Sequence, residues 1–343
     1  MTTREPETYR FDLDNDKAWL NHLETEGFAV IKCALEREEI TKAHSELWAA
    51  LELFPSRDRA ISRGDPTSWS LLPTGICGSL AQSQAAWTVR GSRGVKTAFT
   101  KIWKTDDLIV SMDAVITWKP WWGFANAKNE AQPSVFRSAF SSIASIFGSN
   151  PTASTPLPAG FPPYYKPRGE IMHLDQNPFK KRFRDCVQGM VPLLPVTREI
   201  GGLIVVPHSH NDEMQDRIRQ QQPQLEGGHD FCPIFGFSKT EDALLLIADA
   251  GDLILWDSRT IHGSLAGDGP VALSNEMDFA RMTCTVAMTP RACASKEVLQ
   301  ARREGFLQGK CFNHVPHENN NPHSNAHAGY VPIVLTTQQD ALL

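Results

Sequence analysis

The sequence has few of the features that mark nucleic-acid-binding, membrane or secreted proteins. Its 343 residues contain 34 Lys and Arg against 39 Asp and Glu, a formal charge of −5. The positive surplus that sequence-independent nucleic-acid binding needs is therefore missing. No apolar run approaches the roughly 20 residues that span a bilayer, and the polar, acidic N-terminus does not resemble a secretory signal. We expect no nucleic-acid partner and no membrane partner.

Paired cysteines are also missing. The seven cysteines are widely spaced, their number is odd, and no CxxC motif occurs. This pattern argues against a disulfide scaffold and against a zinc ribbon. Free thiols are typical of a reducing compartment, so we expect a cytoplasmic location.

The composition is that of a folded, globular chain. Hydrophobic residues make up 41% and charged residues 21%, which argues against disorder over most of the length. No internal repeat or low-complexity tract divides the sequence. We predict one domain over residues 1–343.

The spacing of apolar residues changes along the chain. Residues 1–107 show mostly helical spacing and predict a helical support. Residues 108–290 predict a core of short strands separated by glycine-rich turns, with a long insert at 120–163 of the kind that serves as a lid. Residues 291–343 predict a helix and a tail. The predicted helices are 16–26, 36–54, 82–90, 95–104, 212–222 and 295–308, and the predicted strands are 28–33, 108–117, 170–177, 185–194, 203–207, 243–247, 252–257 and 281–288.

Many short strands with glycine-rich turns indicate a β-sandwich or a β-barrel. The predicted fold class is therefore mainly β with flanking helices (α+β).

One strand carries two residues that suit a metal ion. His173 and Asp175 are two positions apart, so on a strand they share a face. One imidazole and one carboxylate make two thirds of the facial triad that binds Fe(II). His262 follows 89 residues later, after another buried strand, and supplies a candidate third ligand. A salt bridge at the end of a strand is the structural alternative for the first pair.

The next predicted strand carries a cation. Arg281, Thr283 and Thr285 alternate along 281–288 and would share one face. A guanidinium beside hydroxyls suits a polar cavity, where it can bind a carboxylate bidentately.

Taken together, these segments resemble the Fe(II)/2-oxoglutarate oxygenases of the phytanoyl-CoA dioxygenase-like family. The resemblance covers approximately residues 75–290. The combination of HLDQNP with the block Gln82–Trp121 resembles fungal members that act on amino acids or natural-product intermediates. The segments that carry it are Trp103-Lys-Thr-Asp-Asp-Leu108, Trp118-Lys-Pro-Trp121, His173-Leu-Asp-Gln-Asn-Pro178, Cys186-Val-Gln-Gly189, Gly201-Gly-Leu-Ile-Val-Val-Pro-His-Ser-His210 and His262-Gly-Ser264.

The resemblance implies a double-stranded β-helix, the cupin-like jelly roll. It implies that Fe(II) is held by His173, Asp175 and His262, and that 2-oxoglutarate and O2 are cosubstrates. It also implies that the distal carboxylate of 2-oxoglutarate binds Arg281 with help from Ser264. Gln188 lies where relatives place a further cosubstrate contact.

The arginine departs from the family pattern. Arg281 follows His262 by 19 residues, later than is usual in the family. The stretch Ala266–Met277 has the composition of an added loop, which would account for the delay. Arg291 is the alternative if that stretch is not a loop.

Other histidines suggest weaker hypotheses. His208 and His210 form an HxH pair where relatives have a turn, and we interpret them as turn structure. The tail histidines could form a zinc site, but no cysteine pair accompanies them and the surrounding Asn and Pro predict an exposed tail. These tail histidines are His314, His317, His323 and His327.

Four residues are candidate substrate contacts. Arg90 could bind a substrate carboxylate or lie at the surface near a helix end, with Trp87 beside it. Asn177 could touch substrate or begin the turn before Pro178. Trp118 could line the pocket or fill the core.

The function hypothesis that follows is a dioxygenase coupling 2-oxoglutarate decarboxylation to oxidation of a small organic acid, amino acid or secondary-metabolite intermediate. Hydroxylation, desaturation and ring closure all remain open, as does the oligomeric state. The expected substrate is small and anionic, because Arg90 and Trp87 would suit one carboxylate beside an apolar side chain. An acyl-CoA is not expected, because Lys and Arg are sparse in the segments predicted at the cavity mouth. The alternatives are a cupin-type metal enzyme that does not use 2-oxoglutarate, and a non-catalytic binding module.

Overall fold

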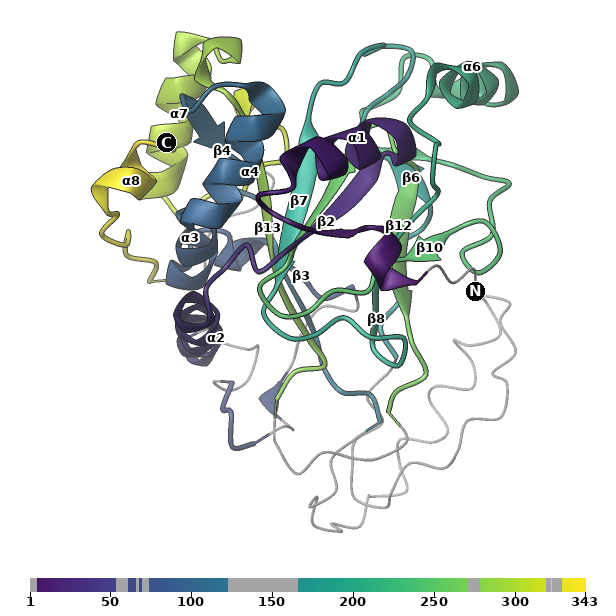
Figure 1. Cartoon of the computed structure of the whole chain (residues 1–343). Helices are drawn as coiled ribbons and strands as arrows, with labels where there is room; N and C mark the ends of the chain where they lie inside the picture. Colours follow the sequence, from purple (N-terminus) through teal and green to yellow (C-terminus); the bar gives the residue numbers. More distant parts are fainter. Residues whose placement is uncertain are drawn as a thin grey trace.

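The computed structural model describes residues 5–53, 61–65, 68–69, 74–122, 166–270, 278–318, 322 and 329–343 (Figure 1). The insert predicted at 120–163 lies almost entirely outside the described residues. So do His323, His327 and part of the stretch Ala266–Met277. Within the described ranges, no helix is long and apolar enough to cross a membrane.

Two sheets form the centre of the molecule (Figure 1). The larger sheet has the order β1-β2-β11-β7-β13-β5-β3, with β4 also paired to β13, and the smaller has the order β10-β8-β12-β6-β9. Every pairing is antiparallel except β1 with β2. The strands are β1 (Arg10–Asp12), β2 (Phe28–Lys32), β3 (Ile76–Cys77), β4 (Leu108–Val110), β5 (Val115–Trp118), β6 (His173–Leu174), β7 (Val187–Pro192), β8 (Gly201–Val205), β9 (Cys232–Pro233), β10 (Leu244–Leu245), β11 (Leu253–Asp257), β12 (His262–Ala266) and β13 (Arg281–Pro290).

The two sheets pack face to face around a shared apolar core. Met190 and Trp256 of the larger sheet join Leu174 and Val205 of the smaller sheet in one buried cluster. Alternation of side chains along each strand buries one apolar set between the sheets. The jelly roll predicted from the sequence is confirmed.

Helices cover the outer face of the larger sheet, on the left of Figure 1. A second buried cluster joins Trp87 and Phe99 of these helices to Val286 and Met288 of β13. This layer corresponds to the predicted helical support. Over the described residues the helices are α1 (Asp16–Glu26), α2 (Arg37–Glu52), α3 (Gln84–Arg90), α4 (Arg93–Trp103), α6 (Asp212–Gln221), α7 (Lys296–Leu307) and α8 (Thr337–Asp340). Helix α6 lies apart from this layer, at the upper right of Figure 1.

The strand predicted over 108–117 is broken into β4 and β5. Residues 111–114 leave the regular ladder because their backbone is held by neighbouring segments. Ser111 donates its N–H to the carbonyl of Ala287 at 2.7 Å, and the Arg90 guanidinium donates to the carbonyl of Asp113 at 2.8 Å. The apolar pattern alone did not reveal this interruption.

The segment 311–318 is packed against the core, so the expectation of an exposed tail is wrong there. Phe312 and Val315 are buried. The fully buried Arg302 of α7 donates hydrogen bonds to the carbonyls of Val110, Pro316 and Leu342. A guanidinium with several donors can thus tie the C-terminal segments to β4.

Candidate metal centre and its cavity

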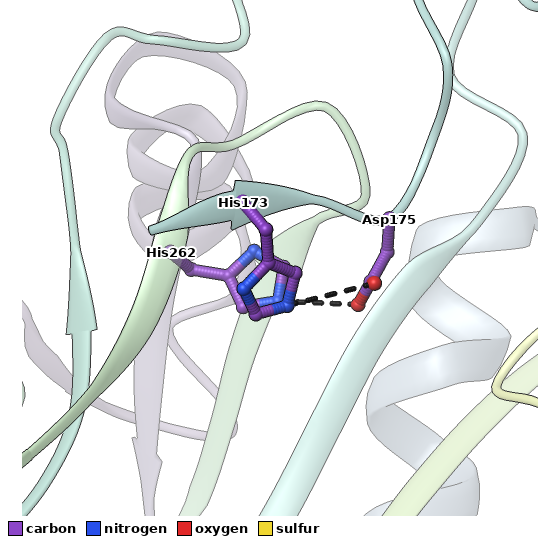
Figure 2. Close-up of side chains that lie close together, drawn as sticks. All are labelled: His173, Asp175 and His262. Carbon is purple, nitrogen blue, oxygen red and sulfur yellow. Dashed lines mark ion pairs between the residues drawn. The ribbon is translucent and has the colours of Figure 1, made fainter. Parts of the chain in front are cut away.

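Two short strands bring His173, Asp175 and His262 together (Figure 2). His173 in β6 is the register partner of His262 in β12, and their ring centroids lie 4.3 Å apart. Asp175 follows the end of β6 and turns its carboxylate toward both rings. The distance from Asp175 Oδ1 to His173 Nε2 is 3.6 Å, and from Asp175 Oδ2 to His262 Nε2 it is 3.2 Å. The three donor atoms all lie within 4.8 Å of one another.

Two glycines allow β6 and β12 to approach this closely. A Cβ on Gly263 would lie 2.9 Å from the carbonyl oxygen of Ile171 and 3.0 Å from that of Glu170. A Cβ on Gly169 would lie 2.0 Å from the carbonyl oxygen of Ser264. Any larger residue would push the two strands apart, so the glycine after His262 has a direct role in placing the site.

Hydrogen bonds fix both imidazoles in the orientation that a metal needs. Nδ1 of His173 lies 2.7 Å from the carbonyl oxygen of Ile171, and Nδ1 of His262 lies 2.9 Å from that of Thr260. A carbonyl only accepts, so each Nδ1 carries a proton, and Nε2 is the atom of each ring that can bind a metal when the ring is neutral. Two Nε2 atoms and one carboxylate are the donor set of a facial Fe(II) site, and these residues therefore fit the metal.

Burial and mutual charge set the protonation of the three groups. Burial lowers the pKa of His173 to about 4, so this ring is neutral near pH 7. Burial would raise the pKa of Asp175, but the neighbouring histidines, His314 first among them, hold it well below its usual range. Burial would also lower the pKa of His262, but the hydrogen bond and charge of Asp175 outweigh burial and raise it. The ionised carboxylate thus favours a cation at this point.

The three residues line a cavity of about 190 Å³. Gln188 of β7 also lines it and donates from Nε2 to Asp175 Oδ2 at 3.1 Å. Gln188 therefore orients the carboxylate in this structure, as partners of metal ligands commonly do. The remaining described lining residues are Ile76, Ser111, Asp113, Ala114, Ile116, Glu170, Gly189, Met190, Leu203, Phe231, Trp256, Thr285, Val286, Ala287 and His314.

Arg281 is a buried cation at the start of β13, only 3% exposed. Its Nε donates to Thr283 Oγ1 at 3.4 Å, its Nη2 lies 3.4 Å from Met190 Sδ, and its guanidinium stacks 4.5 Å from the Trp118 ring. Among the described residues no carboxylate forms an ion pair with it. Burial lowers the pKa of Arg281 to about 10, and the charge of Glu170 opposes that effect.

Ser264 lies two positions after His262 on β12, and its hydroxyl accepts the N–H of Glu170 at 2.8 Å. The alternative cation, Arg291, pairs with the exposed Asp107 at 3.0 Å, whereas Arg281 is buried. Neither arginine nor Ser264 is among the described residues that line the cavity, but Met190, which Arg281 contacts, is one of them. Residues 267–270 and 278–280 between β12 and β13 contain no strand, consistent with the added loop predicted there.

The predicted substrate contacts do not line the cavity. Arg90 is fully buried and donates to the carbonyls of Ala81 and Asp113, so its charge holds backbone in place. Trp87 is buried in the helical layer against Phe306.

Asn177 forms a turn, since its side chain donates to the carbonyls of Leu225 and His229 and accepts the N–H of Phe179. Trp118 is buried beneath Arg281 instead of facing the cavity. Each side chain is engaged with the protein itself, and we withdraw all four as substrate contacts.

The other histidines divide into two groups. His208 and His210 bind the carbonyls of Thr25 and Glu24, which is the turn structure that we expected. His314 lines the cavity instead of lying in an exposed tail. Its Nδ1 is 3.9 Å from Asp175 Oδ2, and its buried Nε2 has no hydrogen-bond partner. No local sequence pattern pointed to this placement.

His317 joins Asp185 and Glu318 in a second group of possible metal ligands. Lys181 already places its ammonium 2.8 Å from both carboxylates, and His317 lies 3.3 Å from Asp185. We interpret this group as an ion-pair clasp that holds the segment 311–318, because the lysine supplies the positive charge.

Comparison with known proteins supports the family resemblance. Residues 135–270 match the model of the phytanoyl-CoA dioxygenase family. The chain is 23% identical over 328 residues to Ava biosynthesis cluster protein O of Aspergillus versicolor, covering 87% of this chain and 86% of that protein.

Two solved structures are similar to this chain. A hypothetical protein from Escherichia coli has a TM-score of 0.51 and 16% identity, covering 98% of this chain and 85% of its own. The epimerase SnoN, crystallised with Fe3+, α-ketoglutarate and nogalamycin RO, has a TM-score of 0.46 and 11% identity, covering 80% of this chain and 84% of its own.

Proposed function

We propose that the protein is an Fe(II)- and 2-oxoglutarate-dependent oxygenase acting on a small organic molecule. The observation that carries this proposal is the donor set of His173, Asp175 and His262. Both imidazoles direct Nε2 toward one ionised carboxylate, and all three residues line a cavity. When bound, iron and 2-oxoglutarate supply with O2 an oxidant able to attack an unactivated C–H bond, releasing succinate and CO2.

The second support is the buried guanidinium of Arg281. A carboxylate arriving from outside would form charge-assisted hydrogen bonds with it, and Trp118 beneath the guanidinium would keep it in place. We assign Arg281 to the distal carboxylate of 2-oxoglutarate, with Ser264 of β12 in the smaller sheet as a second donor. A metal enzyme that does not use 2-oxoglutarate, or a binding module, would have no use for this unpaired cation.

The chain's remaining work is positioning and exclusion of water. Gln188 holds the Asp175 carboxylate at a fixed angle. His314 forms part of one wall of the cavity. Shielding of this kind protects a reactive oxidant from side reactions. The biosynthesis-cluster name of the Aspergillus relative supports a natural-product intermediate as the substrate, with hydroxylation, desaturation or ring closure as the outcome.

The test is 2-oxoglutarate-dependent release of succinate by the purified protein supplied with Fe(II) under air. Wild-type protein should release succinate slowly without a second substrate and faster with one. The His173→Ala variant should bind no iron and release none. A matched control is His208→Asn, which changes a half-exposed turn histidine outside the cavity and should behave as wild type. Iron-loaded wild-type protein that released no succinate would contradict the proposal.

A further inference from the structure

We propose that Asp113 binds a basic nitrogen of the substrate, either a protonated amine or a guanidinium. This inference rests on the proposed function and names the substrate class of the same cavity. The first observation is the charge of the residues that line the cavity. The described lining contains the carboxylates of Asp113, Glu170 and Asp175 but neither Lys nor Arg.

The backbone around Asp113 is fixed by neighbouring elements. The residue lies in the interruption between β4 and β5. Arg90 donates to its carbonyl at 2.8 Å, and Thr285 Oγ1 donates to the carbonyl of Ala114 at 2.6 Å. Phe312 N–H donates to the carbonyl of Met112 at 2.8 Å. A side chain on such a segment is preorganised, so little entropy is lost when a ligand binds it.

The carboxylate of Asp113 has no cationic partner among the described residues. Its Oδ1 accepts the N–H of the next residue, Ala114, at 2.6 Å, and Cys311 Sγ lies 4.0 Å away. The nearby Arg90 guanidinium is used on main-chain carbonyls instead. Burial raises the pKa of Asp113, and the charge of His314 opposes that effect. A buried carboxylate in this state gains strongly from a hydrogen-bonding cation.

When iron and 2-oxoglutarate are bound, the carboxylate of Asp113 still has no ion-pair partner among the described residues. The two positive charges of Fe(II) would balance Asp175 and one carboxylate of 2-oxoglutarate, and Arg281 would balance the other carboxylate. Asp113 and Glu170 then remain as acidic lining residues that form no ion pair among the described residues. The charges of His314 and Arg90 act on Asp113, and those of His262 and Arg281 act on Glu170. A cationic substrate restores the balance, whereas the anionic substrate expected from Arg90 would make the imbalance worse.

The rest of the wall is apolar, which indicates what the basic nitrogen is attached to. Ile76 and Ile116 line the cavity with Asp113, and Phe231 and Trp256 line it beside the histidines. Phe231 stacks 4.7 Å from the His173 ring. An aromatic or aliphatic body with one basic end fits these surfaces.

Anaerobic titration of the Fe(II)–2-oxoglutarate complex with scaffold-matched probes tests the inference. The probes are phenethylamine, phenethylguanidine and 3-phenylpropionate, and the signal is the change in the visible absorption band. Wild-type protein should respond to at least one of the two basic probes, with 3-phenylpropionate binding at least tenfold more weakly. Asp113→Asn should weaken that basic probe about 10- to 100-fold, because a neutral amide replaces the buried charge.

The control is Asp106→Asn, which removes an exposed carboxylate seven residues away and should titrate as wild type. If Asp113→Asn does not form the band, Asp113→Glu is titrated and should keep the preference for the basic probe. Failure of wild-type protein to form the band at all contradicts the proposed function. Three results would contradict this inference alone when the wild-type band forms normally. They are no response to either basic probe, stronger binding of 3-phenylpropionate than of the basic probes, and unchanged affinity of Asp113→Asn for the basic probe.

Discussion

Replacement of Arg281 by Met separates the role of this cation in binding from any role in stability. In the unliganded protein, burial lowers the pKa of Arg281 from 12.5 to about 10. At 1.36 kcal/mol per pKa unit, burial of the charge costs about 3 kcal/mol. The pKa in the folded state is the lower one, so the full cost applies at every pH below about 10. Met keeps much of the apolar volume and removes that cost.

We therefore expect Arg281→Met to keep or slightly raise the free energy of unfolding of the protein without ligands. Loss of the stacking contact with Trp118, worth about 1 kcal/mol, offsets part of the gain. The affinity for 2-oxoglutarate should fall by about 3–5 kcal/mol, or roughly 10²- to 5 × 10³-fold, because a buried carboxylate loses its charged partner.

The assay is anaerobic titration of the Fe(II)-loaded protein with 2-oxoglutarate, accompanied by urea unfolding of the unliganded protein. The matched control is Arg291→Met, which removes a cation paired at the surface with Asp107 and should leave 2-oxoglutarate binding unchanged. If Arg281→Met bound 2-oxoglutarate within threefold of wild type, or if Arg291→Met had the larger effect, the assignment of the cosubstrate site would be refuted.

Three further changes test the supports of the site. Gln188→Leu removes the hydrogen bond to Asp175 and should weaken Fe(II) binding about 10- to 100-fold in a chelator competition; unchanged affinity would show that Gln188 does not orient the ligand. Asp185→Asn should remove about 1–2 kcal/mol of unfolding free energy. Burial alone would raise the pKa of Asp185, but His317 and a lysine lower it to about 2. The stabilisation is therefore present above pH 3.8 and lost as the pH falls through about 2. A pH-independent difference in urea unfolding between the variant and wild type would argue against the clasp. Gly263→Ala places a Cβ 2.9 Å from a carbonyl oxygen of the opposing strand and should cost about 1–3 kcal/mol; wild-type stability in urea would contradict the close approach.

Local pattern marked the residues of the candidate metal centre, and the family resemblance combined them into one site. His173 and Asp175 are two positions apart at the end of one strand, and His262 opens another strand that the fold returns to the first. The alternation of Arg281 and Thr283 likewise placed both on one face of β13. These relations depend on strand period and strand order, which the sequence expresses directly.

The wall of the cavity facing the substrate could not be predicted in the same way. Asp113 reaches the cavity because Arg90, 23 residues earlier, holds the interruption between β4 and β5. His314 reaches it because Asp185 and Lys181 hold the following residues by ion pairs. Both placements depend on contacts between segments far apart in the chain, and an arginine that binds main-chain carbonyls has the same local pattern as one that binds a substrate.

The most direct test of the central claim follows oxygen from O2 into succinate. Protein loaded with Fe(II) and 2-oxoglutarate is exposed to ¹⁸O₂, and the succinate is analysed by mass spectrometry. The account predicts succinate carrying one oxygen atom from O2 in wild-type protein, and none above background in Asp175→Ala. Iron-loaded wild-type protein that consumed no 2-oxoglutarate, or that gave only unlabelled succinate, would contradict it.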